Sequence, residues 1–493
     1  MRVNRRELIA SGVATLPSAA AQRTPARRKN ILFLLSDQHR PDGLGIEGNA
    51  LAQTPRLDEL ARQGIRFSNA YCTDPVCTPS RASILTGLYT RRHRAFTNGT
   101  PWPFEIKTVA HHFARAGYMT AAIGKMHFVD AQTHGFDYRM DFNEWYQYLG
   151  PKTALYADEL NRSNSGSGLP QIATLWEHGD PWKGARKDDH RKGLVHTGRA
   201  SLIKEEDHFE SFVARESVRF LKQHAQKQPF FLVSGFLKPH DPFMPADRFA
   251  RMFTADRMKL PDTWGKVNMS EVPVEIRKRI EVHAPTPEVN APAEAKQRIA
   301  MYWANVAQLD HALGQVLDTL KDLNLDQDTI VVYSSDHGEM LGDHGLFQKF
   351  VFYEPSLGVP LIFRVPGMQQ GKICRTPASL AQLVATFCEL CNVPVPAGLD
   401  GPSLVPALRA PDKTTNPIVY AEFASHTKAG RAMIRKGSYK YSHYFSDSPE
   451  LYDLSKDPRE MQNLAASAQH KGLLNDLHAQ LVAWRGAGPS NPV

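Results

Sequence analysis

Acidic, basic and imidazole side chains follow four apolar runs of the sequence, at the points where predicted strands end. They are Asp37 and Gln38, Lys125 and His127, Lys238, His240 and Asp241, and Asp336 and His337. The carboxyl ends of parallel strands meet at one edge of a sheet, where ligands bind. Each residue alone is better explained as a solvated loop residue, but the convergence of four strand ends favours a site.

Four of these residues could hold a metal ion. Asp37, Gln38, Asp336 and His337 offer mostly oxygen ligands and no cysteine pair, which suits Ca²⁺ or Mg²⁺ better than structural zinc. Two neighbouring carboxylates repel one another, and a cation between them removes that cost and supplies a Lewis acid. Aspartate also caps helices that follow strands, and the spacing alone does not separate the two interpretations.

A cysteine stands at the predicted start of a helix in residues 77–87, CTPSRASILTG. Pro79 and Ser80 are helix-start signals, and Arg81 follows one turn after Cys77. A helix start lowers the pKa of a thiol and attracts anions. The alternatives at this stage are a buried structural cysteine and a thiolate nucleophile.

The elements that must position these residues alternate between strands and helices. Strands are predicted at 30–37, 118–123, 229–236 and 329–336, and helices at 57–64, 108–117, 208–223 and 304–323. The continuous apolar runs of the strands indicate burial on both faces. We therefore predict an α/β fold with a mainly parallel sheet.

Two regions and the C-terminal part depart from this alternation. Residues 139–200 and 255–297 lack clean periodicity, and we interpret them as insertions over one edge of the sheet. After about residue 370 the segments become shorter, which predicts a small α+β subdomain. The expected organisation is an export signal and linker in 1–29, a catalytic domain in 30–370 and a C-terminal subdomain in 371–493.

Composition excludes several classes of protein. The 493 residues are 42% hydrophobic and 22% charged, which excludes a disordered chain. Five cysteines cannot form a disulfide scaffold. Of the net charge of +8, residues 1–29 supply +6 through seven basic residues and one acidic one. No basic stripe follows, so we expect no nucleic-acid partner.

The N-terminus has the layout of an export signal. Arg5 and Arg6 precede a short apolar stretch, and small residues follow at 18–21, as in a twin-arginine signal. The alternative is a basic N-terminal arm. The apolar stretch is far shorter than the ~20 residues of a membrane span. We expect a periplasmic or secreted protein without a membrane span; the sequence carries no signal for its oligomeric state.

The string 77–87 resembles the signature of the type I sulfatases, Cys-x-Pro-Ser-Arg-x-x-x-Leu-Thr-Gly, at every fixed position. Further segments resemble other motifs of that family: 124–127 (GKMH), 239–242 (PHDP), 335–339 (SDHGE), 345–349 (GLFQK) and 450–464. The resemblance covers the chain from Asn30 to about Leu464. It implies an alkaline-phosphatase-like fold, with a large mixed, mainly parallel sheet sandwiched by helices.

The resemblance also implies a chemistry. In that family a maturation enzyme converts the cysteine to formylglycine (3-oxoalanine), whose hydrated form attacks sulfur. Cys77 would be this nucleophile, Arg81 and Lys125 would hold the diol, and His127 would accept its second proton. His240 and Lys349 would bind sulfate and protonate the leaving alcohol. The metal, expected to be Ca²⁺ with Mg²⁺ or Mn²⁺ as alternatives, would take Asp37, Gln38, Asp336 and His337.

The sequence departs from the most common pattern of the family. Gln38 and His337 replace the usual Asp and Asn, a combination that resembles the choline-sulfatase and phosphonate-monoester-hydrolase branch. His344, beside the lysine segment, is a further candidate for substrate binding or a loop residue. The substrate could be a sulfated saccharide, an aryl sulfate or choline sulfate. The alternatives are a phosphonate or phosphate ester hydrolase and, if Cys77 stays unmodified, a non-catalytic binder of sulfated ligands.

The remaining cysteines and aromatic residues receive structural interpretations. We expect Cys72 not to be bonded to Cys77, and Cys388 and Cys391 to be core thiols. Aromatic residues of the first insertion could stack on a sugar or enclose a quaternary ammonium, although local packing is the more common role for any one of them. They are Trp145, Tyr146, Trp176 and Trp182.

Overall fold

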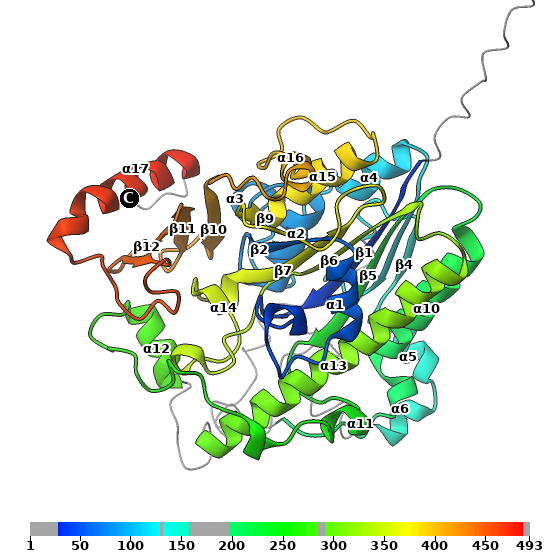
Figure 1. Ribbon diagram of the computed structural model, residues 1–493, viewed down its shortest axis with the longest axis horizontal. Coiled ribbons are helices and arrows are strands. Elements are labelled where there is room, and N and C mark those ends of the chain that lie inside the picture. The colour runs from blue at the N-terminus through cyan, green and yellow to red at the C-terminus, as the bar shows by residue number, and fades with distance from the viewer. Residues whose placement is uncertain (1–27, 129–131, 157–197, 283–290, 487–493) are drawn as a thin grey trace, which may run out of the picture.

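A nine-stranded mixed sheet forms the centre of the computed structural model, which describes residues 28–128, 132–156, 198–282 and 291–486 (Figure 1). The strand order is β4-β3-β5-β1-β6-β7-β2-β8, with β9 also paired to β2. The strands are β1 (Asn30–Asp37), β2 (Ile65–Tyr71), β3 (Met119–Gly124), β4 (Tyr138–Met140), β5 (Phe230–Pro239), β6 (Thr329–Ser335), β7 (Gly358–Arg364), β8 (Lys372–Cys374) and β9 (Ala378–Ser379). The five strands from β4 to β6 are parallel, and β7 runs antiparallel to both β6 and β2.

The five central residues of β1 are all apolar because both faces of the strand are buried. Ile31, Phe33 and Leu35 pack on one face of the sheet, while Leu32 and Leu34 pack on the other, and all five are fully buried. Successive side chains point to opposite faces of a strand. Because helices cover both faces, the middle of β1 is apolar, and its polar residues stand only at its ends, Asn30 at the start and Ser36 and Asp37 at the end. The predicted α/β class and mainly parallel sheet are confirmed.

Two groups of helices form these layers (Figure 1). One face carries α2 (Cys77–Thr86), α4 (Val109–Arg115) and α15 (Leu383–Leu390), with α3 (Thr90–His93) and α16 (Val405–Arg409) beside them. The other carries α1 (Pro55–Arg62), α10 (Phe209–His224) and α13 (Pro292–Asp322), with α5 (Phe142–Leu149), α6 (Lys152–Leu155) and α11 (Asp247–Ala250) further out. The short helices α12 (Val274–Val282) and α14 (Glu354–Leu357) lie nearer the C-terminal part.

The second predicted insertion contains more regular structure than expected. Helix α13 begins at Pro292, whereas the periodicity predicted a start at residue 304. Proline is common in the first turn of a helix, because the backbone N–H that it lacks would have no acceptor there. The Pro-rich composition therefore hid the start of this helix. Helix α12 also lies in this region. In the first insertion, α5 and α6 are described, and residues 157–197 lie outside the described part of the chain.

A second, four-stranded antiparallel sheet follows in the order β10-β11-β12-β13. Its strands are β10 (Val419–Phe423), β11 (Arg431–Lys436), β12 (Tyr439–Tyr444) and β13 (Glu450–Asp453), and α17 (Lys471–Arg485) packs across it. The sequence placed the subdomain boundary at residue 370, but β8 and β9 pair with β2. The small sheet therefore begins at Val419, and 371–418 mostly complete the large layer structure.

The small sheet is attached to the large one next to Cys77. The backbone N–H of Glu422 on β10 donates to the carbonyl of Thr73, four residues before Cys77, at 2.9 Å. Lys440 on β12 donates to the carbonyl of Phe352 at 2.8 Å. None of the described helices is both long and apolar enough to cross a bilayer. The predicted export signal lies outside the described residues except for Arg28 and Lys29.

A tyrosine hydroxyl ties the end of β1 to α13. The Tyr302 side chain is fully buried; its hydroxyl donates to the carbonyl of Gln38 at 2.9 Å and accepts from the N–H of Arg40 at 3.0 Å. Gln38 has a positive φ of 67°, a conformation that needs support from its surroundings in a residue other than glycine.

Removing this hydroxyl should destabilise the fold. We expect Tyr302→Phe to lower the free energy of unfolding by about 1–3 kcal/mol, because the substitution leaves a buried N–H and a buried carbonyl without partners. Equilibrium urea denaturation measures the change. Tyr439→Phe, at the half-buried start of β12, is the control, with an expected change within about 0.5 kcal/mol. Equal midpoints for the two variants would contradict the role of the Tyr302 hydroxyl.

Candidate active site

The ends of four parallel strands bring the predicted site residues to one edge of the sheet. Ser36 pairs with Ser335 across β1 and β6, so Asp37 and Asp336 follow side by side. Asp37 is opposite Pro239 of β5, which precedes His240. Gly124, at the end of β3, is opposite Gly235 and precedes Lys125. Strand register alone therefore brings two carboxylates, an ammonium and an imidazole together.

Arg81 links the two carboxylates. Its Nε is 2.7 Å from Asp336 Oδ2 and its Nη2 is 2.9 Å from Asp37 Oδ2. Lys125 Nζ lies 2.7 Å from the same Asp37 oxygen. All four side chains are essentially inaccessible to solvent. Such buried charges are tolerated only when they are paired this closely.

The two aspartates differ in their protonation. Burial raises the pKa of Asp336 to about 7, and repulsion by Asp37 adds to the shift in spite of Arg81. Burial also acts to raise the pKa of Asp37, but Lys125, His240 and Arg81 together hold it well below its usual value. A further cation at the site would therefore lower the pKa of Asp336 and favour the charged form of both aspartates.

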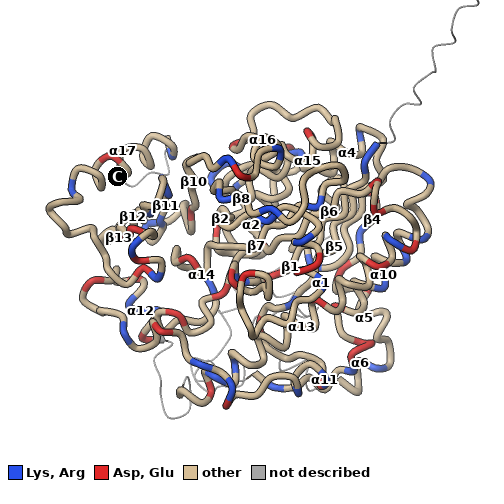
Figure 2. The backbone as a smooth tube through the Cα atoms, viewed as in Figure 1, with Lys and Arg blue, Asp and Glu red and all other residues tan. Residues whose placement is uncertain are grey.

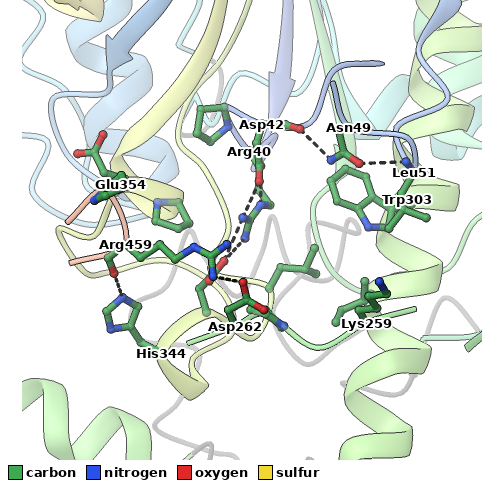
Figure 3. A pocket seen from close by; sticks show the side chains of 17 residues that line it. Arg40, Asp42, Asn49, Leu51, Lys259, Asp262, Trp303, His344, Glu354 and Arg459 are labelled. Atoms are coloured by element: carbon green, nitrogen blue, oxygen red, sulfur yellow. Dashed lines mark hydrogen bonds and ion pairs between the residues drawn. The ribbon is translucent and has the colours of Figure 1, made fainter. Parts of the chain in front are cut away.

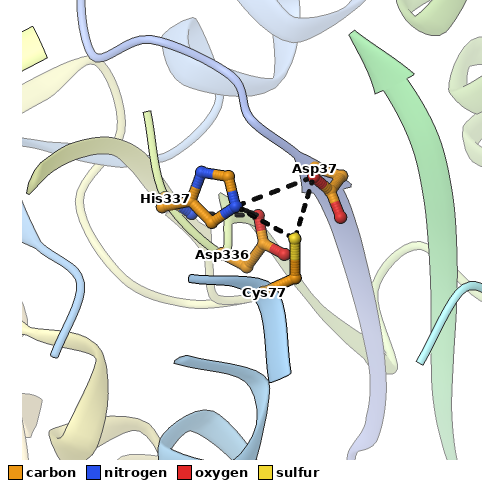
Figure 4. A group of neighbouring side chains, drawn as sticks. All are labelled: Asp37, Cys77, Asp336 and His337. Carbon is orange, nitrogen blue, oxygen red and sulfur yellow. Dashed lines mark hydrogen bonds and ion pairs between the residues drawn. The ribbon is translucent and has the colours of Figure 1, made fainter. Parts of the chain in front are cut away.

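Cys77 completes a group of four potential ligands (Figure 4). One ligand atom from each of Asp37, Cys77, Asp336 and His337 lies within 4.8 Å of the others. Cys77 Sγ is 3.2 Å from His337 Nε2 and 3.7 Å from Asp37 Oδ1. Two carboxylates, a neutral imidazole and a fourth atom from residue 77 fit a divalent cation.

Gln38 lies beside this group, but its amide is engaged elsewhere. Its Oε1 accepts from Lys349 at 2.5 Å, and its Nε2 donates to Asp241 and Glu339 at 3.1 and 2.5 Å. A cation that uses the Gln38 oxygen therefore competes with Lys349. Asp241 was predicted to lie at a strand end of the site but was given no role, and Glu339 was not predicted, although it stands within the 335–339 motif.

The Cys77 thiol is not activated. Burial raises its pKa to about 12, and Asp37 adds to the shift, while Lys349 and Lys125 act in the opposite direction. The expectation that a helix start would lower this pKa is therefore wrong, because burial and a nearby carboxylate outweigh the helix and the two lysines. A thiol in this state is a poor nucleophile at neutral pH.

Lys349 and His240 form a contact directly beside Cys77. Lys349 Nζ is 2.8 Å from His240 Nε2 and 3.6 Å from Cys77 Sγ. Burial and the neighbouring Lys349 lower the pKa of His240 to about 4. Burial opposes the charge on Lys349, but Cys77, Asp37 and Asp241 raise the pKa of its ammonium. Lys349 is thus the proton donor of the pair and His240 the acceptor.

Lys125 and His127 approach from the end of β3. His127 is half-buried and has a positive φ of 56°. Burial, followed by Lys125 and Arg81, lowers the pKa of His127 well below its usual value. The imidazole is therefore neutral at physiological pH and able to accept a proton.

The described contacts of His344 lie away from Cys77. Its ring stacks on Tyr353 at 4.1 Å between centroids, and its Nε2 contacts the Arg459 carbonyl at 2.9 Å. His344 lines a separate pocket of about 410 Å³ beside Arg40, Asp262 and Trp303 (Figure 3). The structure thus brings together the other ten predicted site residues without His344.

The residues that were expected to have structural roles mostly lie in the core. All five cysteines are free and buried, so Cys72 and Cys77 are not bonded, and Cys388 and Cys391 lie in the core. Trp145 packs on Phe209 and donates to the Asp207 carbonyl at 2.8 Å. Trp176 and Trp182 lie outside the described residues.

The geometry is suited to a tetrahedral anion. Lys349, Lys125, Arg81 and His240 surround the end of the Cys77 side chain, and the neutral imidazoles can accept or pass on protons. Fixed positive groups stabilise a transferring group whose charge is spread over several oxygens.

Comparison with known proteins agrees with this geometry. The model of the family "Sulfatase" matches residues 29–393, and the model "N-sulphoglucosamine sulphohydrolase, C-terminal" matches residues 342–487. The choline-sulfatase of Rhizobium meliloti (strain 1021) is 31% identical over 457 residues, covering 89% of this chain and 82% of that protein. An arylsulfatase of Clostridium perfringens (strain 13 / Type A) is 29% identical over 471 residues, covering 92% and 94%.

A solved structure extends the likeness to the fold. The phosphonate monoester hydrolase of Agrobacterium radiobacter has a TM-score of 0.76 and 25% identity, covering 93% of this chain and 95% of that one. The family match spans most of the chain and includes every strand of the large sheet. This chain belongs to the sulfatase family, and its architecture is that of the alkaline-phosphatase-like superfamily.

Proposed function

We propose that this protein hydrolyses organic sulfate esters to an alcohol and inorganic sulfate, with a formylglycine derived from Cys77 as the nucleophile. The observation that carries the proposal is the position of Cys77. Its Sγ lies 3.6 Å from the ammonium of Lys349 and next to both aspartates. Burial keeps this thiol protonated. An unmodified thiol gains nothing from this arrangement, whereas an oxygen nucleophile in its place would be surrounded by cations.

The first step transfers the sulfuryl group. One hydroxyl of the hydrated formylglycine gives its proton to the neighbouring Asp37 carboxylate and forms a bond to sulfur, while the bond from sulfur to the alcohol oxygen breaks. Arg81 and Lys125 offset the charge on the diol. The leaving oxygen takes its proton from the Lys349–His240 pair, in which Lys349 holds the proton.

The second step releases sulfate. His127, held neutral, accepts the proton of the remaining hydroxyl. The C–O bond to the sulfate then breaks and the aldehyde forms again, so no water needs to attack sulfur. Addition of water to the aldehyde restores the diol. A serine could not follow this route, because it has no second hydroxyl from which to eliminate.

Asp37, Asp336 and His337 would hold a divalent cation, with Gln38 as a fourth ligand if it leaves Lys349. We expect Ca²⁺, with Mg²⁺ or Mn²⁺ as alternatives, because the donors are mainly oxygen. The bound ion would polarise the sulfuryl oxygens and neutralise the two carboxylates. The oxygen of a modified residue 77 would replace Sγ in the four-atom group.

A second function is favoured by the likeness to a phosphonate monoester hydrolase. Phosphonate and phosphate esters are also tetrahedral anions, and the same cations would bind them. Paired 4-nitrophenyl sulfate, phosphate and phenylphosphonate esters separate the two functions. We expect kcat/KM to be highest for the sulfate; activity confined to the phosphoryl esters would reject the sulfatase proposal. A third alternative, a non-catalytic binder of sulfated ligands, requires an unmodified Cys77.

Maturation and location complete the proposal. A formylglycine-generating enzyme must act on Cys77, and the paired arginines at the N-terminus favour a periplasmic or secreted protein. The substrate is a small sulfated molecule, and we propose no nucleic-acid partner.

The state of residue 77 is directly measurable. We expect mass spectrometry of the peptide that contains residue 77, from protein made in its native source, to show an aldehyde in place of the thiol. Cys77→Ala should lower kcat by at least about 10³-fold and change the unfolding midpoint little, because it removes a single sulfur atom whose hydrogen bonds are weak. Cys391→Ala is the control and should keep its activity. An intact thiol with full turnover would leave Cys77 without the proposed role.

Removal of the cation should lower both the activity and the thermal stability of the protein. We expect dialysis against a chelator to lower kcat by on the order of 10²–10³-fold, with recovery on addition of Ca²⁺. Saturating Ca²⁺ should also raise the unfolding temperature through binding to the native state. Asp336→Asn should abolish this thermal shift, and Asp412→Asn, on an exposed side chain, should preserve it. A shift that persists in Asp336→Asn would place the ion elsewhere.

A further inference from the structure

The lysine at the reacting centre is flanked by two aromatic residues, and each carries an arginine on its ring. The Arg298 guanidinium lies 4.5 Å from the ring centroid of Phe347, and that of Arg279 lies 4.7 Å from the ring centroid of Phe350. Lys349 Nζ is itself 5.8 Å from the Phe350 ring. Arg279 is therefore separated from the sulfate-binding lysine by a single aromatic side chain.

The two arginines differ in how their charge is balanced. Arg298, on α13, is 2% exposed, and three carboxylates act on it, those of Glu294, Glu339 and Asp241. Arg279, on α12, is half-buried, and among the described residues Glu275 is the carboxylate that acts on it. Glu275 in turn pairs with Lys278 at 2.9 Å. Arg279 is thus the less compensated of the two.

Arg279 also lies close to a second guanidinium. Arg431 of β11 donates to the carbonyl of Phe350, and burial together with Arg431 lowers the pKa of Arg279 to about 10. Within the described part of the chain, Arg279 has neither a hydrogen bond nor an ion pair. Helix α12 adds Arg277 and Lys278 to this basic region (Figure 2).

The orientation of Arg279 leaves its donors available. A guanidinium over an aromatic ring makes a cation–π contact through its face. Its five N–H groups point outward in the plane, where they match the two oxygens of a carboxylate or sulfate. A partly desolvated cation whose nearest carboxylate is shared with a second cation gains free energy when an oxyanion binds beside it.

We propose that Arg279 binds a second anionic group of the substrate, a carboxylate or a second sulfate, while the scissile sulfate occupies the position beside Lys349 and Cys77. This inference rests on the proposed sulfatase activity and narrows its substrate to a saccharide that carries at least two negative charges. On this proposal we expect choline sulfate to be a poor substrate, because its trimethylammonium group would lie towards the Arg279 guanidinium.

A pair of sugars that differ in one charge tests the proposal. N-Acetylglucosamine 6-sulfate carries one negative charge, and N-sulfoglucosamine 6-sulfate carries two. We expect the matured protein to show a KM about tenfold lower for the doubly charged sugar. In Arg279→Gln this preference should disappear, and Arg279→Lys should restore part of it. Lys278→Gln removes the same charge from the next residue of α12 and should retain the preference.

Three results would overturn the inference: equal KM values for the two sugars in the unaltered protein, an unchanged preference in Arg279→Gln, or an equal loss in Lys278→Gln. If neither sugar is cleaved, the test becomes one of binding. Calorimetry with N-sulfoglucosamine 6-sulfate then compares Cys77→Ala protein with Cys77→Ala protein that also carries Arg279→Gln. A Kd about tenfold weaker in the double variant supports the role of Arg279 even if sulfate hydrolysis fails; equal Kd values reject it.

Discussion

The contact of Arg81 with Asp37 and Asp336 is the interaction on which the rest of the site depends. Two carboxylates at adjacent strand ends, both shielded from water, would otherwise repel one another at a high cost in free energy. Arg81 stands four residues after Cys77 on α2, and residues four apart lie on the same face of a helix. The contact that neutralises the aspartates thus also fixes residue 77 against them, and sheet, helix and nucleophile cannot move independently.

Backbone conformations of higher energy gather around this contact. Gln38, His127, Gln348 and Phe350 all have positive φ values between 56° and 78°. A residue with a Cβ adopts this region only when its surroundings hold it there. Here the support comes from other elements: Tyr302 of α13 holds the Gln38 carbonyl, and Arg431 of the small sheet holds that of Phe350. Distant parts of the chain therefore stabilise the loops that carry the reacting groups.

Much of the fold followed from local sequence, because the run from Ile31 to Leu35 can only be a strand covered on both faces. The convergence of the strand-end residues followed in turn from the parallel topology. Properties set by distant residues could not be predicted in this way. The pKa of Cys77 depends on its burial and on Asp37, so the direction predicted for its shift from the helix start alone was wrong. His344 is near Lys349 in sequence, but the left-handed turns at both His344 and Gln348 lead it away. Arg279 is one of three consecutive basic residues. Only the structure shows that, among the described residues, Arg277 and Lys278 have hydrogen-bond or ion-pair partners and Arg279 has none.

The hydrogen bond between Glu422 and Thr73 has a consequence for the timing of biosynthesis. Cys77 is 1% exposed in the folded chain, so the proposed maturation enzyme would have to act before the chain folds around this residue. Strand β10 closes over the loop that precedes this cysteine, and a ribosome adds it about 340 residues later. At about 5–20 residues per second, the nascent chain keeps the thiol accessible for on the order of 20–70 s. Under the proposed function, the late synthesis of β10 would set the time that is available for the modification of Cys77.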